Sequence, residues 1–446
     1  MDCASASAII MKMSVLLVSF SFSRGGAAIA ARKFARLAQY FSDVRCFCAE
    51  PSSGEDDLRI LEPSRLEFIF HKIKRIISYA LLKLMTDGNP VKHSLNLFSS
   101  RNVLNGIKVA QSFDTVLHLH WVNNDTLSIF HLYKLPSGSV ITLHDEWFYC
   151  GAEHYYPGES KNKKFIDGYS YRDPDVSGIN WNRLVWKIKL SQLRTRKDLI
   201  FTVPSRWMLD RAKESAILRD KNIQLLPNPI ETDQFKPLEV DERSILRIKH
   251  GIGENDIVFT VGAVKGADNP MKGFDVFINA LALLRPRLGV DMLDSIHFVM
   301  FGGCGDDREE YCGFSVVNLG RVSGTSEMRK VYGIADCTIV PSIVESFGQV
   351  AAESLACQTP VVAFKTSGIM DIVQHGRSGY LAEPYNPESL ADCLYMMIYL
   401  TSLERSALGL FGRSYVKAQF SFPVVGEIYR RVIDDALKAG HHHCPV

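Results

Sequence analysis

The chain has 446 residues, with 51 Lys and Arg against 49 Asp and Glu, a formal net charge of +2 and 46% hydrophobic residues. A chain of this length has room for two or three domains, each with its own core. The near balance of charge excludes a strongly basic nucleic-acid-binding protein and an acidic disordered chain. No apolar run reaches the roughly 20 residues that a membrane-spanning helix needs, so we expect a globular protein that folds in water.

The ten cysteines are too few and too scattered for a disulfide framework, and buried free thiols in a reducing compartment are the expected state. The run Met13–Phe20 resembles the apolar part of a signal peptide. It is short, however, and leads into Arg24-Gly25-Gly26 without a small-residue cleavage site. We interpret it as a buried first strand after a loose leader over residues 1–12, and we predict a cytoplasmic location.

Short runs rich in Val, Ile, Leu and Phe predict strands that are covered on both faces. The first series is Ser14–Phe20, Thr115–Trp121, Ser139–His144, Leu199–Pro204 and Ile223–Leu226. The second series is Ile257–Gly262, Ile296–Gly302, Val316–Leu319, Cys337–Val340, Pro360–Phe364 and Tyr380–Ala382. Helices are predicted over Ala27–Tyr40, Phe274–Arg285, Ser326–Gly333, Val350–Ala356 and Pro387–Leu400.

Alternating strands and helices predict an α/β fold with parallel sheets and right-handed crossovers. The series restarts after the proline-rich loop 227–237, which indicates two Rossmann-like domains that face each other across a cleft. We place the first domain at residues 1–235 and the second at residues 236–412. A C-terminal helix at about residues 413–440 is free to pack back on the first domain.

Two segments fit this plan less well. Leu66–Met85 mixes apolar residues with basic ones, and it is either a helix that lies on an anionic membrane surface or an ordinary surface helix whose apolar stripe packs on its own domain. Residues 150–182 have no clear period, and a loop of this length is usually functional. Within it, Asp173-Pro-Asp175 resembles a metal site, but the proline and the lack of a preceding strand favour a plain turn.

The strongest chemical signal is the segment from Glu345 to Glu353, which follows the strand Cys337–Val340. We expect a helix to begin at Phe347 or Gly348 with Ser346 as its cap. The start of such a helix offers unpaired N–H groups and a positive dipole end to an anion. Glu353, about two turns into the helix, is suited to bind a ribose diol. Taken alone, two glutamates at this spacing also occur by chance.

Two more loops follow strands of the second series, and they converge on the same edge of the sheet. Gly262–Gly273 is rich in glycine and contains Lys272, which can neutralise a diphosphate. Thr366–Asp371, with Gly368, follows the strand Pro360–Phe364. In the first domain, Gly25 and Gly26 follow the first strand and open a helix, which makes a second turn suited to anions.

Together these features resemble the retaining nucleotide-sugar glycosyltransferases of glycosyltransferase family 4, which have the GT-B fold. The resemblance runs from Ser14 to about Leu400 and rests on Glu345, Glu353, Lys272-Gly273, Gly368 and Gly379-Tyr-Leu381. His144-Asp145 and Cys150-Gly151 are similar to the bacterial capsular and colanic-acid-type exopolysaccharide members.

The resemblance implies roles for individual residues. Glu345, Lys272 and His144 would be catalytic: Glu345 at the donor-sugar hydroxyls, Lys272 at the diphosphate and His144 near the reacting sugar. Donor binding would further involve Glu353 at the ribose, together with Phe347, Gly348, Gly368 and Lys265, and the acceptor side would be shaped by Gly25 and Gly26. The family usually has an Arg directly after the first glycine of the second domain. Here that residue is Ala263, and either Lys265 or Arg321 is a candidate to replace the charge.

The activity implied is that of a retaining, metal-independent hexosyltransferase without a cofactor. It would move a sugar from a UDP- or GDP-linked donor to a glycan or lipid-linked acceptor in exopolysaccharide biosynthesis, with peripheral contact at the inner membrane surface and no nucleic-acid partner. A noncatalytic sugar- or nucleotide-binding protein on the same scaffold is the alternative, and Ala263 favours it. A GT-B-shaped epimerase or phosphorylase is a third hypothesis. No G-x-G-x-x-G follows the first strand, which argues against a dehydrogenase.

Overall fold

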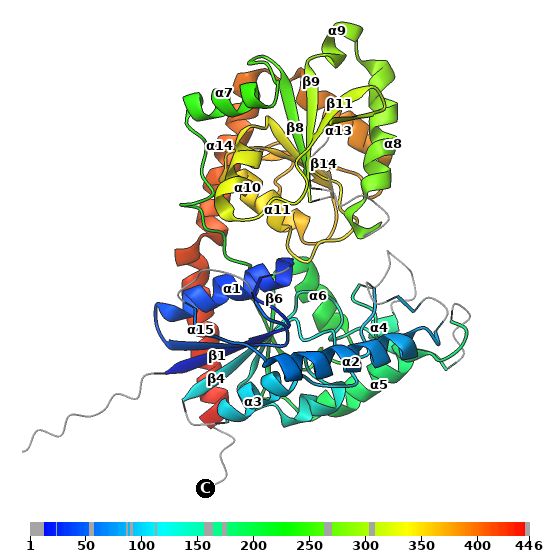
Figure 1. The fold of residues 1–446 in the computed structure, drawn as a ribbon, viewed down its shortest axis with the longest axis vertical. Coiled ribbons are helices and arrows are strands. Elements are labelled where there is room, and N and C mark those ends of the chain that lie inside the picture. Colours follow the sequence, from blue (N-terminus) through cyan, green and yellow to red (C-terminus); the bar gives the residue numbers. More distant parts are fainter. Residues whose placement is uncertain are drawn as a thin grey trace, which may run out of the picture. The chain divides into compact units, whose positions relative to one another are not determined.

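The computed structural model describes residues 13–23, 25–52, 58–85, 88–89, 92–111, 114–155, 164–171, 176–262, 270–302 and 308–441. The chain forms two compact units (Figure 1). The first comprises the chain up to Pro204, Leu209–Leu226 and the residues from Gly426 onward. The second comprises Ser205–Met208 and Pro227–Val425.

The first unit is built on a seven-stranded parallel sheet in the order β3-β2-β1-β4-β5-β6-β7. Its strands are β1 (Ser14–Ser19), β2 (Asp43–Cys48), β3 (Ile60–Leu61), β4 (Thr115–His120), β5 (Val140–Thr142), β6 (Ile200–Val203) and β7 (Asn222–Leu225). The strand order reverses between β1 and β4. The carboxyl ends of these two strands therefore form the switch point, where open α/β sheets bind ligands.

Helices surround this sheet: α1 (Gly26–Gln39), α2 (Arg65–Leu82), α3 (Arg101–Val109), η1 (Ile129–Lys134), α4 (Lys164–Asp167), α5 (Trp181–Leu193) and part of α6 (Arg206–Glu214). The end of the chain adds the residues of α15 (Phe422–His441) from Gly426 onward. Tyr429 of α15 is fully buried, and its ring lies 5.1 Å from that of Phe34 in α1. Its hydroxyl bonds His118 Nδ1 at 2.7 Å, so the last helix is locked onto the first sheet.

The second unit also has a seven-stranded sheet, in the order β10-β11-β9-β8-β12-β13-β14. Its strands are β8 (Ile257–Gly262), β9 (Ile296–Phe301), β10 (Arg308–Tyr311), β11 (Phe314–Asn318), β12 (Cys337–Val340), β13 (Val361–Phe364) and β14 (Gly379–Ala382). Only the edge strand β10 runs antiparallel to its neighbour. The order reverses between β8 and β12, which places the switch point of this sheet at their carboxyl ends.

The helical segments of the second unit are α7 (Val240–Lys249), η2 (Pro270–Lys272), α8 (Phe274–Leu284), η3 (Arg285–Arg287), α9 (Val290–Leu293), α10 (Thr325–Gly333), α11 (Gln349–Ala356), α12 (Ile369–Ile372), α13 (Pro387–Tyr399) and α14 (Ser402–Phe420). One core cluster joins the sheet to α8 and α13 through Phe277 and Leu394. A second joins it to α10 and α11 through Tyr332 and Ala351. The sheet is thus covered on both faces, and the predicted α/β fold class is confirmed.

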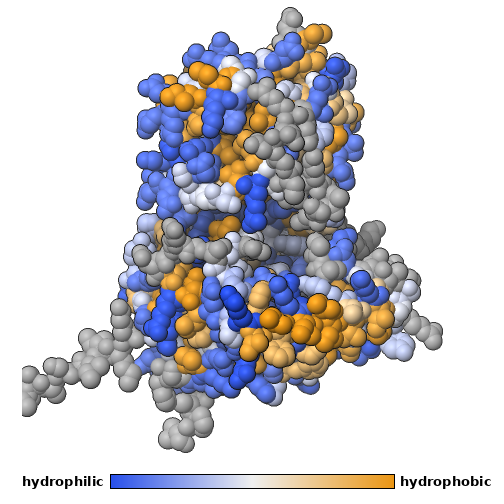
Figure 2. Space-filling view, viewed as in Figure 1, coloured by the Kyte–Doolittle hydropathy of each residue, from blue (hydrophilic) through white to orange (hydrophobic). Residues whose placement is uncertain are grey.

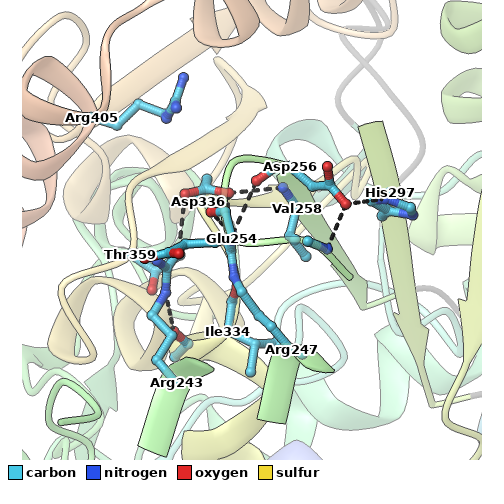
Figure 3. Close-up of polar contacts among 12 residues, drawn as sticks. Arg243, Arg247, Glu254, Asp256, Val258, His297, Ile334, Asp336, Thr359 and Arg405 are labelled. Carbon is cyan, nitrogen blue, oxygen red and sulfur yellow. Dashed lines mark hydrogen bonds and ion pairs between the residues drawn. The ribbon is translucent and has the colours of Figure 1, made fainter. Parts of the chain in front are cut away.

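A buried ionic network fixes α7 at the amino ends of the strands, the edge opposite the switch point (Figure 3). Arg247, 3% exposed, places its guanidinium 2.6 Å from the carboxylate of Asp336 and also donates to the carbonyl O of Asp256 at 3.0 Å. The same Asp336 oxygen accepts the N–H of Val258 at 2.8 Å. The network ties the end of α7 to the segments that lead into β8 and β12.

Two further predictions can be compared with the described residues. Their seven cysteines are all free, and all but Cys312 are buried, which agrees with the expected free thiols. No helix in the described part of the chain combines the length and the apolar character needed to cross a bilayer.

Candidate functional site

Three loops of the second unit meet at the carboxyl ends of neighbouring strands, and Glu345 joins them. Its carboxylate Oε1 accepts hydrogen bonds from Lys272 Nζ at 2.6 Å and from Ser342 Oγ at 2.9 Å. Its backbone N–H donates to Ser367 Oγ at 2.9 Å, and its carbonyl O accepts from the N–H of Gly368 at 2.8 Å. Lys272 comes from the loop after β8, Glu345 from the loop after β12 and Ser367 from the loop after β13. The structure therefore brings Lys272, Glu345 and Gly368 together at the switch point.

The Lys272–Glu345 pair is accessible, since 33% of the lysine side chain and 19% of the glutamate side chain are exposed. Both hydrogen bonds that the Glu345 side chain receives from described residues go to Oε1. Oε2 is then available for a hydroxyl donor, and the ammonium of Lys272 has three N–H groups, of which Glu345 uses one. The pair can hold an anion and a sugar-type hydroxyl side by side.

A tight turn places Lys272. Gly273, the N-cap of α8, has a φ of 66°, in the left-handed region that favours glycine. A Cβ at this position would lie 1.9 Å from the carbonyl O of Pro341, so the turn and the loop after β12 pack backbone against backbone. The N–H of Ile343 also donates to the carbonyl O of Met271 at 2.8 Å. These contacts fix the two loops relative to each other.

The helix α11 begins later than expected. Its N-cap is Gly348, with a φ of 104°, and no side chain caps its first turn. The predicted start at about Phe347 or Gly348 is thus one residue early, and the prediction of Ser346 as cap was wrong, because the left-handed Gly348 separates the serine from the helix. The ring of Phe347 is 3% exposed and packs 5.4 Å from that of Phe420, so its side chain belongs to the core. The first turn of α11 still offers N–H groups and a positive dipole end.

Glu353 is 8% exposed on α11 and is held by protein partners on both carboxylate oxygens. Gln349 Nε2 donates to Oε1 at 2.6 Å, and the hydroxyl of Tyr332 donates to Oε2 at 3.2 Å. Burial, with the neighbouring Glu353 charge, raises the pKa of Tyr332, so this hydroxyl stays a donor. A carboxylate has about four lone-pair sites, of which these two hydrogen bonds use two.

The remaining predicted donor-side residues have different settings. Gly368 adopts a right-handed conformation, and a Cβ there would lie 2.5 Å from the carbonyl O of Ser346. The lack of a side chain at this position lets the loop after β13 pack closely on the loop after β12. Arg321 is exposed just after β11. Lys265 and Ala263 lie outside the described residues, as does the segment Asp173–Asp175.

In the first unit, Gly25 and Gly26 lie where β1 leads into α1, at the switch point of that sheet. Gly25 is the N-cap of α1 with a φ of 90°, and both glycines are exposed. A Cβ built on either residue meets no atom within 4 Å. The start of α1 is therefore open within its unit, as a binding surface requires.

His144 follows β5 in the first unit and is half-buried. Its Nε2 lies 2.9 Å from Nδ1 of His120, the last residue of β4. Burial lowers the pKa of His144 to about 3 and that of His120 well below its ordinary value, so both rings are neutral at neutral pH. One ring then donates and the other accepts, which couples their tautomers. The Nε2 of His120 is buried without a hydrogen-bond partner among the described residues.

Buried polar contacts that were not predicted, by Trp121, Asn123 and Lys189, follow His144 in the loop after β5. Asp145 Oδ2 accepts from Trp121 Nε1 at 2.8 Å and from Asn123 Nδ2 at 3.0 Å, and burial raises the pKa of Asp145 to about 6. Lys189 is fully buried and donates to the carbonyl O of Gly151 at 2.7 Å. Burial lowers the pKa of Lys189 to about 7. These groups hold the loop after β5 in one conformation.

Within the residues that the structure describes, no group of three or more His, Cys, Asp and Glu side chains is arranged to hold a metal ion. The candidate groups of the second unit are a lysine ammonium, helix N–H groups and carboxylates, and those of the first unit are neutral imidazoles.

Part of the second unit is similar to a known family. Residues 242–400 match the family model described as "Glycosyl transferases group 1", and this segment contains Lys272, Glu345 and Glu353. Sucrose-phosphate synthase of Thermosynechococcus elongatus has the same fold, with a TM-score of 0.64 and 16% identity over 95% of this chain and 100% of that one. Anabaena HepE, solved with UDP-glucose, gives a TM-score of 0.62 at 15% identity over 95% and 99% of the two chains. The chain has the GT-B fold of these structures.

Among curated proteins, the D-inositol 3-phosphate glycosyltransferase of Corynebacterium jeikeium is 30% identical over 227 residues, which is 49% of this chain and 53% of the relative. An uncharacterized glycosyltransferase of Methanocaldococcus jannaschii is 34% identical over 128 residues, which is 27% of this chain and 31% of the relative. The matches thus span about half or less of the length of these relatives.

Proposed function

We propose that this protein is a retaining glycosyltransferase that moves a hexosyl unit from a UDP- or GDP-linked sugar to a glycan or lipid-linked acceptor. The observation that carries the proposal is the Lys272–Glu345 pair at the switch point of the second sheet, beside the uncapped start of α11. The matched segment over residues 242–400 and the GT-B fold support it.

The proposed chemistry rests on positive charge at the leaving group. As the bond from the sugar to the diphosphate breaks, negative charge builds on the phosphate oxygens, and Lys272 with the N–H groups of α11 stabilises it. The departing phosphate accepts the proton of the acceptor hydroxyl on the same face of the sugar, so the configuration is retained without a covalent enzyme intermediate. Glu345 holds Lys272 through Oε1 and binds a donor-sugar hydroxyl through Oε2. No metal or cofactor takes part in this scheme.

The proposed donor pocket extends along α11 to Glu353, which binds the ribose diol while Gln349 and Tyr332 hold its carboxylate in place. On the acceptor side, Gly25 and Gly26 shape the surface, and His144 contacts the reacting sugar. The product belongs to an exopolysaccharide or another surface polysaccharide, and the reaction takes place at the cytoplasmic face of the membrane. The names of the curated relatives make a phosphorylated inositol a second acceptor class to test.

The alternative is a noncatalytic nucleotide- or sugar-binding protein on this scaffold. Release of nucleotide diphosphate distinguishes it from an enzyme. An enzyme releases free nucleotide diphosphate from UDP- or GDP-sugars in the presence of its acceptor, and it does so slowly by hydrolysis in its absence. A binding protein gives a thermal shift with the same ligands and releases nothing. Release from at least one donor supports the enzyme; a thermal shift without release from any donor and acceptor pair favours the alternative.

The first prediction concerns Lys272→Met. Loss of a preorganised charge at the leaving group costs roughly 10²–10³ in rate, so release of nucleotide diphosphate should fall by that factor. Lys249→Met, at the exposed end of α7, is the matched control and should keep the wild-type rate. Equal rates for both variants would remove Lys272 from the mechanism.

A further inference from the structure

The apolar face of α2 points outward. Leu66, Phe70 and Ile76 are 69%, 63% and 65% exposed. The same stripe, at spacings of three and four residues, includes the exposed residues Ile69, Ile73 and Ile77. Figure 2 shows an apolar patch on the face of the first unit where Figure 1 places α2. A monomeric protein seldom exposes a contiguous apolar face of this kind unless something binds it.

The side of α2 that faces its own unit is polar. His71 Nε2 donates to the carbonyl O of Asp125 at 3.1 Å, and Lys74 Nζ donates to the carbonyl O of Ser99 at 3.2 Å. Arg75 forms an ion pair with Glu50 at 2.6 Å. These contacts fix the rotation of the helix about its axis. The interpretation of Leu66–Met85 as a helix whose apolar stripe packs on its own domain was therefore wrong.

The helix is formed before anything docks on it. Ser64 and Glu67 make a complete capping box at its start, which satisfies two of the N–H groups of the first turn. With the inward contacts of the polar side, this leaves an 18-residue helix whose outer face needs no folding step on binding.

Basic residues line one flank of the apolar stripe. Arg65 and Lys83 are five turns apart at about 3.6 residues per turn, and Lys72 lies about two turns after Arg65, so the three share one side of the helix. All three are exposed. The single acid of α2, Glu67, is engaged in the cap. The outer surface of α2 is therefore apolar along its centre and cationic along one edge.

The apolar surface continues beyond the helix. Leu84 is 51% exposed, and its carbonyl O accepts the N–H of Ile179 at 2.9 Å. Ile179 is 41% exposed, so exposed apolar residues also occur where the chain after α2 pairs with the segment before α5.

We propose that this face of α2, with its basic flank, docks the protein on the anionic lipid surface of a bilayer. A helix that lies in the membrane interface has this combination of a large apolar face and flanking cations. Charge complementarity favours this occupant over a second copy that packs antiparallel on the same face. Two copies paired antiparallel about a two-fold axis would bring the basic flank of one against that of the other. An anionic lipid surface is then a partner of the proposed glycosyltransferase, but lipid binding itself requires no transfer activity.

The test is co-sedimentation of the full chain with phosphatidylcholine vesicles, with and without phosphatidylglycerol, at low and high salt. We expect binding to the anionic vesicles, weakened by salt. Charge reversal at Lys72 or Lys83 should lower the partition coefficient by about fivefold per residue or more. The double variant Ile73→Glu/Ile76→Glu should lower it by at least about tenfold, because two carboxylates replace apolar contacts in the interface. Ile245→Glu, at a residue that is 66% exposed on α7 of the other unit, is the control and should bind as wild type.

The outcomes separate the possible occupants. Absence of wild-type binding to anionic vesicles, or equal binding by the Ile73→Glu/Ile76→Glu variant, overturns the proposal. A wild-type dimer that this variant converts to a monomer, without vesicle binding, assigns the face to a second copy and also overturns it. Binding of nucleotide diphosphate is measured in parallel and should be the same for the wild type and the Ile73→Glu/Ile76→Glu variant. This measurement tests the proposed function separately from lipid binding.

Discussion

Glu345 uses its backbone and its side chain for different tasks. The backbone N–H and C=O tie the loop after β12 to Ser367 and Gly368, while the carboxylate holds Lys272. A substitution that keeps the backbone and the shape but removes the charge should separate these tasks. The same carboxylate also weakens the binding of a diphosphate, because it takes one of the three N–H groups of Lys272 and repels a second anion.

Glu345→Gln should therefore bind UDP a few-fold more tightly than the wild type, while its transfer rate falls. The gain follows from the release of Lys272 from its carboxylate partner, and the loss follows from a weaker hold on the sugar hydroxyl. Calorimetry and a release assay measure the two effects. Glu327→Gln, at an exposed ion pair with Lys330, is the control. Weaker UDP binding by Glu345→Gln with unchanged stability would contradict the account.

The main residues of the candidate site could be predicted from the sequence, but most of their hydrogen-bond partners could not. Gln349 lies four residues before Glu353 on one helix face, so this contact was readable from the spacing. Nothing in the sequence marks Ser342 and Ser367 as partners of Glu345, because serines after strands are common in turns. His120 was readable in part, because β4 places it on the same face as His118.

At the scale of elements, glycines set how closely the loops approach. Gly273→Ala should destabilise the second unit, since its Cβ would enter the carbonyl O of Pro341 and its backbone is left-handed. Strain of this kind costs roughly 1–3 kcal/mol, with more from the clash. Gly289→Ala, where a Cβ meets nothing within 4 Å, is the matched control and should change the free energy of unfolding little. Chemical denaturation measures both; equal stability of the two variants would show that the turn relaxes freely.

Strands and helices were predicted correctly where the pattern of apolar residues alone determines which of the two forms. The central strands, such as β1 and β12, are continuous apolar runs, and the predicted Cys337–Val340 is the observed β12. The edge strands β3 and β10 were missed, because β3 has only two residues and β10 reads Arg-Glu-Glu-Tyr. The periodicity of α2 predicted its apolar stripe but not its direction. That direction depends on inward polar contacts with residues distant in sequence, such as Asp125 and Glu50.

Across the whole chain, the acid sensitivity that we expect comes from histidines of the first unit that are neutral in the folded state. Burial lowers the pKa of six described histidines of this unit, to about 3 for His118 and His144 and about 4 for His154; the others are His71, His120 and His131. In an unfolded chain their pKa is about 6.5. Below that pH the unfolded state binds more protons than the folded state, so the free energy of unfolding falls as the pH falls.

Buried carboxyls oppose this effect in part. Burial raises the pKa of Asp145 to about 6 and also raises the pKa values of Glu153 and Asp125. As the pH falls, the folded state therefore binds these protons at a higher pH than the unfolded state does. The histidines are more numerous and outweigh them. Lys189, with a pKa lowered to about 7, adds stability only as the pH rises above 7.

Thermal unfolding of the full chain should therefore show a decline in stability as the pH falls below about 6.5, by roughly 1 kcal/mol per histidine and pH unit before the opposing carboxyls are counted. His154→Gln removes one titrating group, so its stability should depend less steeply on pH. An identical slope for this variant and the wild type would contradict the assignment of acid sensitivity to the buried histidines.

The most direct test of the central claim is a calorimetric comparison of UDP and pyrophosphate on the full chain and two variants. Lys272 is assigned to the diphosphate and Glu353 to the ribose. Lys272→Met should then weaken both ligands by about tenfold or more, while Glu353→Gln should weaken UDP alone, since charge-assisted hydrogen bonds are worth about 1.5–3 kcal/mol. Unchanged affinity of both variants for UDP, measured beside a wild type that binds it, would contradict the placement of a nucleotide diphosphate at this site.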